Sequence, residues 1–325
     1  MTTLSRRGLA ALAAAFAMAL AAVPGSAQQK PVIKVSSLTL PVFNPLVWNV
    51  MKARGIDAKH GFELDIHAYP SIAAFYAAFA TGETDALIGG PTIFQKLASE
   101  GVPVRIIGTG FTLADLVVFA KDPAIKSLAD LKGKQLAIDM GGSQYQVVKI
   151  YATAKGIDLG KDITVVNANF AVARAQLEAG RVDAALVIEP LASIITKQHA
   201  DWHVIFNGAQ GWKEITGESG WEIVPAMRGD AIAKNANAPK MLLAALQDVA
   251  AVFEKEPAAA DKIANETLKL PPGIFTAAVE SKRLQMIVKP AWESATKMSI
   301  TDMMERAVEA GFYEKMPDPA IIYAP

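Results

Sequence analysis

Short β-rich runs alternate with helix-forming stretches along most of this chain. Val32–Leu38 and Phe62–Ala68 have the residue pattern of strands, and Ser71 is a good N-cap for a helix that Gly82 closes. The same order of strand and helix recurs as far as Ala184–Ile188. This alternation predicts an α/β fold with parallel sheets that helices cover on both faces.

The last third of the chain has a different pattern. Pro239–Phe253 carries an apolar stripe at helical spacing, and Ser299–Asp302 has the form of a capping box in front of another helix. We therefore expect a mostly helical C-terminal tail.

One segment of the chain repeats. Thr81–Ala86 matches Ala179–Ala184 at a distance of 98 residues, and each copy lies between an Ala-rich helix and an apolar strand that then meets a proline. The match predicts two lobes of similar topology, although a coincidence between common βαβ units would give the same pattern.

The first 27 residues have the form of a secretory signal peptide. Arg6 and Arg7 precede an uncharged run, Gly8–Val23, and Ala27 ends a small-residue cleavage site. The arginine pair resembles a twin-arginine signal, so both the Sec and the twin-arginine export routes stay open. The alternative to a signal peptide is a buried N-terminal helix. We expect cleavage after Ala27, a periplasmic location and a mature chain with a charge of about −2, from 30 basic and 32 acidic residues.

Composition and motifs exclude several functions. The 325 residues contain no cysteine, which excludes disulfides, thiolate chemistry and a lipoprotein anchor, and the balanced charge argues against nucleic acid as a partner. No phosphate-binding loop or nucleophile motif occurs, and His199 and His203, with Asp201 between them, have no further His or Cys nearby. We expect a binding protein rather than an enzyme, with no catalytic residue, metal or cofactor.

The carboxyl ends of the predicted strands are the expected place for a ligand. Ser71, Thr92 and Ser143 lie at predicted helix N-termini, where free backbone N–H groups bind anions, although each could be a plain N-cap. These loops also carry aromatic residues and no Lys or Arg. A mostly apolar pocket with a few polar anchors suits an organic ligand.

An ordered set of short motifs supports a family resemblance. These motifs are Asn44–Trp48, His60–Ile66, Gly82–Ala86, Gly89–Pro91, Gly101–Val104, Ile125–Lys134, Gly180–Ala184 and Glu189–Pro190. In this order they resemble the periplasmic substrate-binding proteins of ABC importers, in the nitrate, sulfonate, taurine and bicarbonate group, over about residues 31–260. The resemblance implies two doubly wound α/β lobes joined by two crossing strands (the type II periplasmic binding protein fold), with the helical tail on the first lobe. It places the first lobe at 31–115 plus 227–325 and the second lobe at 116–226.

The resemblance also implies a set of ligand contacts. By position these are Leu38, Thr39, Ser71, Gly90, Pro91, Thr92, Gly142, Ser143, Gln144 and Glu189. To them we add residues of the strand-end loops and of the return crossing, namely Phe43, Asn44, Asp115, Tyr145, Asn169 and Trp221. Leu38 and Ile188 depart from the Gln and Trp of many members, and the cysteine run of the thiamine-precursor members is absent, which argues against taurine-like and thiamine-precursor ligands.

The function that follows is a monomeric receptor that captures a small organic anion, a sulfonate or a carboxylate, by closure of its two lobes. It would deliver this solute to an inner-membrane ABC permease and its ATPase. The alternatives are a receptor for an inorganic anion of the nitrate or bicarbonate type, an enzyme of the lyase or pyrimidine-synthesis type on the same fold, and a sensory receptor.

Overall fold

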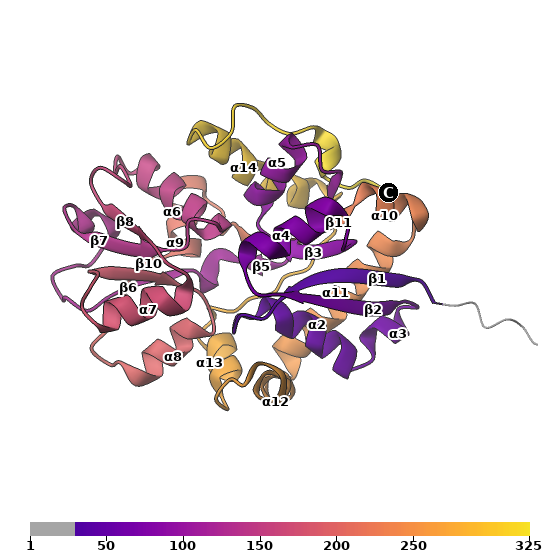
Figure 1. Ribbon diagram of the computed structural model, residues 1–325, viewed down its shortest axis with the longest axis horizontal. Helices are drawn as coiled ribbons and strands as arrows, with labels where there is room; N and C mark the ends of the chain where they lie inside the picture. The colour runs from indigo at the N-terminus through magenta and orange to yellow at the C-terminus, as the bar shows by residue number, and fades with distance from the viewer. Residues whose placement is uncertain (1–29) are drawn as a thin grey trace, which may run out of the picture. The chain divides into compact units, whose positions relative to one another are not determined.

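Two β-sheets organise the chain in the computed structural model, which describes residues 30–325 (Figure 1). The first sheet has the strand order β2-β1-β3-β11-β4, and β5 pairs with β11. Its strands are β1 (Val32–Leu38), β2 (Glu63–Tyr69), β3 (Ala86–Gly89), β4 (Val104–Ile106), β5 (Phe111–Thr112) and β11 (Trp221–Arg228). Strand β1 is parallel to β2 and β3, whereas β11 runs antiparallel to β3, β4 and β5.

The second sheet has the strand order β10-β6-β9-β7-β8. Its strands are β6 (Val117–Ala120), β7 (Gln135–Ile138), β8 (Thr164–Asn167), β9 (Ala184–Val187) and β10 (His203–Asn207). Strand β7 is parallel to β8 and β9, and β6 is antiparallel to β9 and β10. The α/β fold is as predicted, but the sheets are mixed rather than parallel throughout, because in each sheet the strand that follows a crossing from the other sheet runs against its neighbours.

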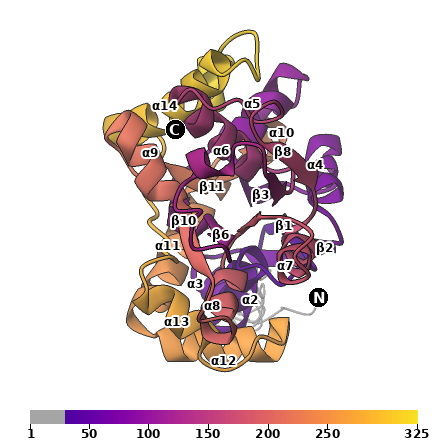
Figure 2. The same ribbon diagram turned by 90° about the vertical axis from the view of Figure 1, so that its left-hand side faces the viewer.

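Helices cover both sheets, and the two views of the ribbon show them on either side of the strands (Figures 1 and 2). Around the first sheet they are α2 (Asn44–Ala53), α3 (Ile56–Lys59), α4 (Ile72–Thr81) and α5 (Pro91–Ser99). Around the second they are η2 (Leu128–Leu131), α6 (Ser143–Ala154), α7 (Phe170–Glu178), α8 (Leu191–Gln198) and α9 (Gly208–Thr216). Apolar side chains between strands and helices form one buried cluster in the second lobe and two in the first.

The C-terminal tail is helical, as predicted. After β11 it forms α10 (Gly229–Lys234), α11 (Ala238–Lys255), α12 (Pro257–Leu268), α13 (Ile274–Glu280), α14 (Ser294–Glu309) and η3 (Pro319–Ile321). The predicted helix Pro239–Phe253 is α11. The capping box at Ser299–Asp302 is wrong, because α14 already begins at Ser294 and Ser299 donates to the carbonyl of Thr296 inside it.

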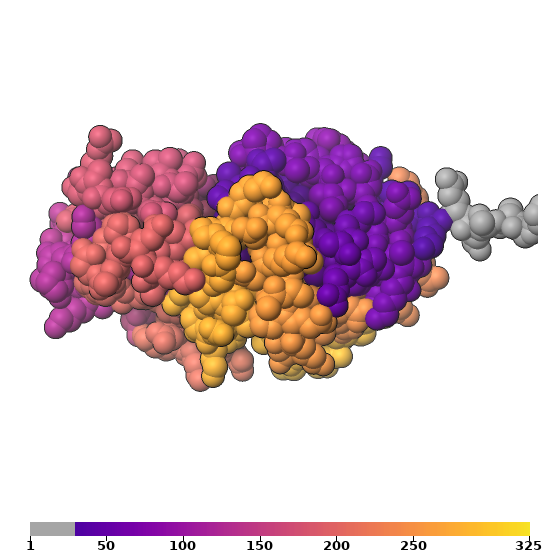
Figure 3. All heavy atoms as spheres, turned by 90° about the horizontal axis from the view of Figure 1, so that it is seen from below, coloured from indigo at the N-terminus to yellow at the C-terminus, as the bar shows by residue number. Residues whose placement is uncertain are grey.

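The tail contacts both lobes. Helices α11 and α12 pack on α2 of the first lobe, while α13 packs on α8 and α14 on both α5 and α6. Figure 3 shows the orange segment that contains α12 and α13 beside both the indigo first lobe and the salmon second lobe. The tail therefore connects the lobes in addition to covering the first one.

The repeated segment forms the same structure twice. Asp85 precedes β3 and accepts the N–H of Lys34 at 2.9 Å, and Asp183 precedes β9 and accepts the N–H of Gln135 at 2.8 Å. Each aspartate N–H in turn donates to the carbonyl of the same partner residue. Since β3 and β9 are the middle strands of their sheets, the repeat marks two lobes of equivalent topology.

The chain crosses between the sheets twice. It leaves the first sheet through β5 and the turn η1 (Leu113–Asp115), enters the second at β6, and returns from β10 through α9 to β11. The residue limits that we predict for the lobes stay a prediction. The signal peptide lies outside the described residues, and none of the helices described is long and apolar enough to span a bilayer.

Candidate functional site

A pocket of about 60 Å³ lies among the strand ends of both sheets. The first lobe supplies residues at the ends of β1 and β3, residues of the loop after β1 and residues of α4, and the second supplies the N-terminus of α6 and the residues after β9. The crossing segments add Phe111, Asp115, Glu222 and Ile223. Ligand sites of α/β sheets occur at such strand ends.

Half of the predicted ligand contacts line this pocket. These are Leu38, Phe43, Asn44, Asp115, Gly142, Ser143, Gln144 and Glu189. The rest of the wall was not among the predicted contacts: Leu40, Val42, Ile72, Phe75, Tyr76, Ile88, Phe111, Phe170, Ile188, Glu222, Ile223 and Leu284. Most of the wall is therefore apolar, and none of its residues is Lys, Arg or His.

The other predicted contacts lie outside the lining. They are Thr39, Ser71, Gly90, Pro91, Thr92, Tyr145, Asn169 and Trp221. Most of these residues have other partners. Ser71 and Asn169 cap α4 and α7, where they accept from Ala74 N at 3.2 Å and Val172 N at 3.0 Å.

The anion anchors expected at three helix N-termini do not converge in the pocket. Only the N-terminus of α6, with Gly142 and Ser143, lines it. The N–H of Gly90 at the start of α5 donates to the hydroxyl of Tyr76 at 2.8 Å. Trp221, the first residue of β11, donates from Nε1 to Ser299 Oγ of α14 at 2.9 Å.

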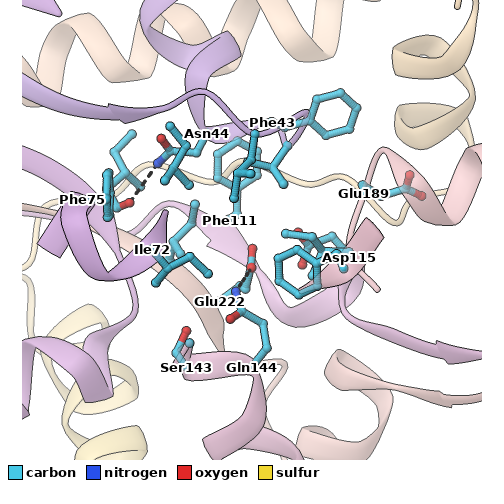
Figure 4. A pocket seen from close by; sticks show the side chains of 18 of the residues that line it. Phe43, Asn44, Ile72, Phe75, Phe111, Asp115, Ser143, Gln144, Glu189 and Glu222 are labelled. Carbon is cyan, nitrogen blue, oxygen red and sulfur yellow. Dashed lines mark hydrogen bonds between the residues drawn. The ribbon is translucent and has the colours of Figure 1, made fainter. Parts of the chain in front are cut away.

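Two buried carboxyl groups face each other in the wall. Asp115 ends the turn η1 and Glu222 follows the first residue of β11, and the pairing of β5 with β11 brings them together. Each residue is 4% exposed, and their carboxyl groups lie within hydrogen-bond reach. Gln144 Nε2 also donates to Glu222 Oε1 at 2.6 Å (Figure 4).

Burial controls the ionisation of this pair. It raises the pKa of Asp115 well above the ordinary value, and the neighbouring Glu222 adds to that rise. Burial also raises the pKa of Glu222, against the opposing effect of its hydrogen bonds with Asp115 and Gln144. Two carboxyl groups this close titrate as a pair, so that ionisation of one opposes ionisation of the other.

Glu189 is held by a different set of partners. Its fully buried side chain accepts from Arg283 Nε at 2.6 Å and from the N–H and hydroxyl of Ser193 at 3.0 Å. In Figure 4 its carboxylate points away from Asp115 and Glu222. Glu189 therefore connects the end of β9 with the tail, and both of its carboxylate oxygens already accept hydrogen bonds from Ser193 or Arg283.

The two lobes touch beside the pocket. A Cβ atom added to Gly90 would collide with the side chain of Ser143, so the N-termini of α5 and α6 approach closely enough to require glycine there. Tyr313 follows α14 and joins the same two helices. Its hydroxyl donates to Thr92 O at 2.8 Å and accepts from Gln146 Nε2 at 3.0 Å.

Glu222 is the main polar residue that sequence reasoning missed. It stands between Trp221 and the apolar run Ile223–Met227 of the same strand, and a carboxylate beside such a run is a usable signal. Leu284 and Tyr76 carry no comparable signal, because their pattern is that of ordinary helix and loop residues. Over residues 30–325, no group of three or more His, Asp or Glu side chains is placed to hold a metal ion.

Known structures share this arrangement of two lobes. The alkanesulfonate-binding protein SsuA of Xanthomonas axonopodis pv. citri, solved with MOPS bound, matches with a TM-score of 0.75 and 16% identity over 91% of this chain and 99% of that one. The periplasmic aliphatic sulphonate binding protein SsuA of Escherichia coli matches with a TM-score of 0.74 and 17% identity, over 90% and 92%. The fold is thus that of the bilobal periplasmic binding proteins.

Sequence comparison identifies the family. The family described as NMT1/THI5 like matches residues 50–260, and the chain belongs to it. A protein of Brucella abortus (strain 2308), named only as a binding protein, is 22% identical over 284 residues, which cover 84% of each chain.

Proposed function

We propose that this protein is a periplasmic receptor that captures a small organic solute and delivers it to an inner-membrane ABC permease. The observation that carries the proposal is the mostly apolar pocket at the strand ends of both lobes, with a few buried polar groups in its wall. Contacts with both lobes would make ligand binding favour the closed arrangement. The names and fold of the relatives support a transport role, and the predicted signal peptide supports the location.

The nature of the solute follows from the charges of the wall. The sequence predicts an organic anion, with an inorganic anion as the alternative, and two similar structures are named for sulfonates. At 16% and 17% identity these names do not fix the ligand of this chain. Since the wall has three acidic residues and no basic one, its charge does not favour an anion.

Calorimetry and chemical recovery test the proposed function. The purified chain should bind one solute of a broad panel with a 1:1 stoichiometry, and denaturation should return that solute chemically unchanged. The permease would receive the solute from this receptor, so deletion of the gene that encodes this protein should abolish uptake of the same solute. If no solute of the panel bound, or if uptake persisted, the receptor proposal would fail.

An enzyme on the same fold is the second candidate, because Asp115 and Glu222 form a buried carboxyl pair whose pKa values burial raises. Such pairs can act as general acid and base. Turnover separates the two functions, since an enzyme would convert a bound solute that a receptor returns intact.

A further inference from the structure

The polar groups of the pocket wall are predominantly hydrogen-bond acceptors. Besides the carboxyl pair Asp115 and Glu222, the wall contains the side-chain amides of Asn44 and Gln144. All four residues are at least nine-tenths buried, at 4–7% exposure. Figure 4 shows Asn44 across the pocket from Gln144, with the Glu222 carboxylate between them.

Two amide oxygens of the wall have no hydrogen-bond partner, namely Asn44 Oδ1 and Gln144 Oε1. The amide orientations follow from their partners. Asn44 Nδ2 donates to the carbonyl of Ile88 at 2.9 Å and Gln144 Nε2 donates to Glu222. Because both partners only accept, the amide oxygens must be the free atoms.

Unpartnered buried acceptors are unfavourable. A ligand that donates hydrogen bonds would remove this penalty, and a ligand that only accepts would not. The amide N–H groups of Asn44 and Gln144 are already bonded, and the hydroxyl oxygen of Tyr76 accepts from Gly90. The hydroxyl of Ser143 and the backbone N–H groups at the N-terminus of α6 are the remaining donors beside the pocket. The buried side-chain oxygens without a partner are acceptors, which favours a ligand that donates hydrogen bonds.

We propose that the pocket binds an organic cation, a solute with a protonated amine or amidinium group on an apolar body, and that Asp115 and Glu222 are its counter-charges. The amide oxygens of Asn44 and Gln144 accept further N–H groups of the ligand. Phe43, Phe75, Phe111 and Phe170 surround its apolar body, and aromatic faces attract cations. This inference rests on the proposed receptor function and specifies its substrate class.

The ionisation of the carboxyl pair gives the binding a defined pH dependence. A cation requires ionised carboxylates, and burial raises the pKa of both carboxyl groups in the empty pair. A bound cation favours the ionised forms, so its affinity falls as the pH is lowered through these pKa values. The charged and titratable groups near the pair are Glu189, whose charge Arg283 neutralises, and Tyr76.

A set of ring compounds of equal size tests the charge preference. Benzamidinium and benzylammonium carry the proposed head groups, benzamide is neutral, and benzoate and benzenesulfonate are anions. Calorimetry with the full chain should show binding of the cations, with an affinity that rises as the pH is raised. Binding of the anions, or an affinity for the cations that rises toward low pH, would overturn the inference.

Isosteric variants test the assignment of the residues. Asp115→Asn and Glu222→Gln keep the shape of the wall and remove the charge, and each should weaken benzamidinium binding at least tenfold, about 1.4 kcal/mol. Glu63→Gln is the control, because Glu63 is an exposed residue of β2 away from the pocket. Equal affinities of all three variants would contradict the assignment, and circular dichroism establishes that each is folded.

The outcomes separate this inference from the receptor function. If only neutral or anionic solutes bind, the cation inference fails while the receptor function stands. If no compound of any charge binds, here or in the broad solute panel, both proposals fail.

Discussion

Arg283 Nε donates to Glu189 Oε1 at 2.6 Å, and this pair joins the tail after α13 to the end of β9 in the second lobe. The Glu189 side chain is fully buried and that of Arg283 is 20% exposed. Arg283 also donates from Nη2 to Ser193 Oγ at 3.2 Å. The contact lies beside the pocket, since Glu189 and Leu284 both line it. The pair therefore joins the tail to the second lobe at the place where the lobes would close on a ligand.

Loss of Arg283 should destabilise the closed protein strongly. Arg283→Gln leaves the Glu189 carboxylate buried without its cation, and breaking a buried pair in this way costs about 3 kcal/mol. Urea unfolding measures the loss. The control is Arg54→Gln, which breaks an exposed pair with Glu256, with side chains 40% and 48% exposed, and should cost less than about 1 kcal/mol. Equal losses for the two variants would show that the Glu189 pair has no special role.

A side chain at position 90 should hold the lobes apart. The backbone angles of Gly90, φ −68° and ψ 131°, suit alanine, so Gly90→Ala should fold, yet its methyl group would collide with Ser143. We expect a larger radius of gyration by small-angle X-ray scattering and weaker ligand binding. Adding Ser143→Gly should restore both values. An unchanged scattering profile of Gly90→Ala would show that this approach does not limit closure.

The ligand-free protein should become more stable when Asp115 loses its ability to ionise. The raised pKa means that the native carboxyl keeps its proton to a higher pH than the unfolded one. Between the unfolded-state pKa, about 3.9, and the raised native pKa, the native state binds more protons, so this group makes stability fall as the pH rises.

Asp115→Asn removes that contribution. At pH 7.5 its melting temperature should exceed that of the wild type by roughly 2 °C or more, and the difference should shrink toward pH 4. Calorimetric scans across this range give the comparison, with Glu63→Gln as the variant that should follow the wild type. A lower melting temperature for Asp115→Asn at neutral pH would mean that the ionised carboxylate stabilises the fold.

The hydroxyl of Tyr313 should contribute to closure through its bonds to Thr92 and Gln146. Tyr313→Phe removes both and should lower the free energy of unfolding by about 1–2 kcal/mol, with a small increase in the radius of gyration. Tyr323→Phe, in a ring that packs on Trp292, is the comparison. If both variants were equally stable, the Tyr313 bridge would contribute nothing measurable.

Local features of the fold were predictable from the sequence. Ser71 and Gly82 begin and end α4, and the stripe of Pro239–Phe253 forms α11, because caps and periodicity depend on neighbours within a few residues. The repeat also predicted two lobes of similar topology, and in the structure Asp85 and Asp183 make equivalent bonds to adjacent strands.

The tertiary structure alone decided the chemistry of the pocket. Asp115 and Glu222 lie 107 residues apart in the sequence and meet because β5 pairs with β11. Arg283 reaches Glu189 because the tail packs on α8 as well as on the first lobe. No local sequence pattern indicates such long-range pairings. The sequence therefore determined two lobes whose strand ends are rich in aromatic residues. Only the packing of these lobes decided that the wall of the pocket between them is acidic.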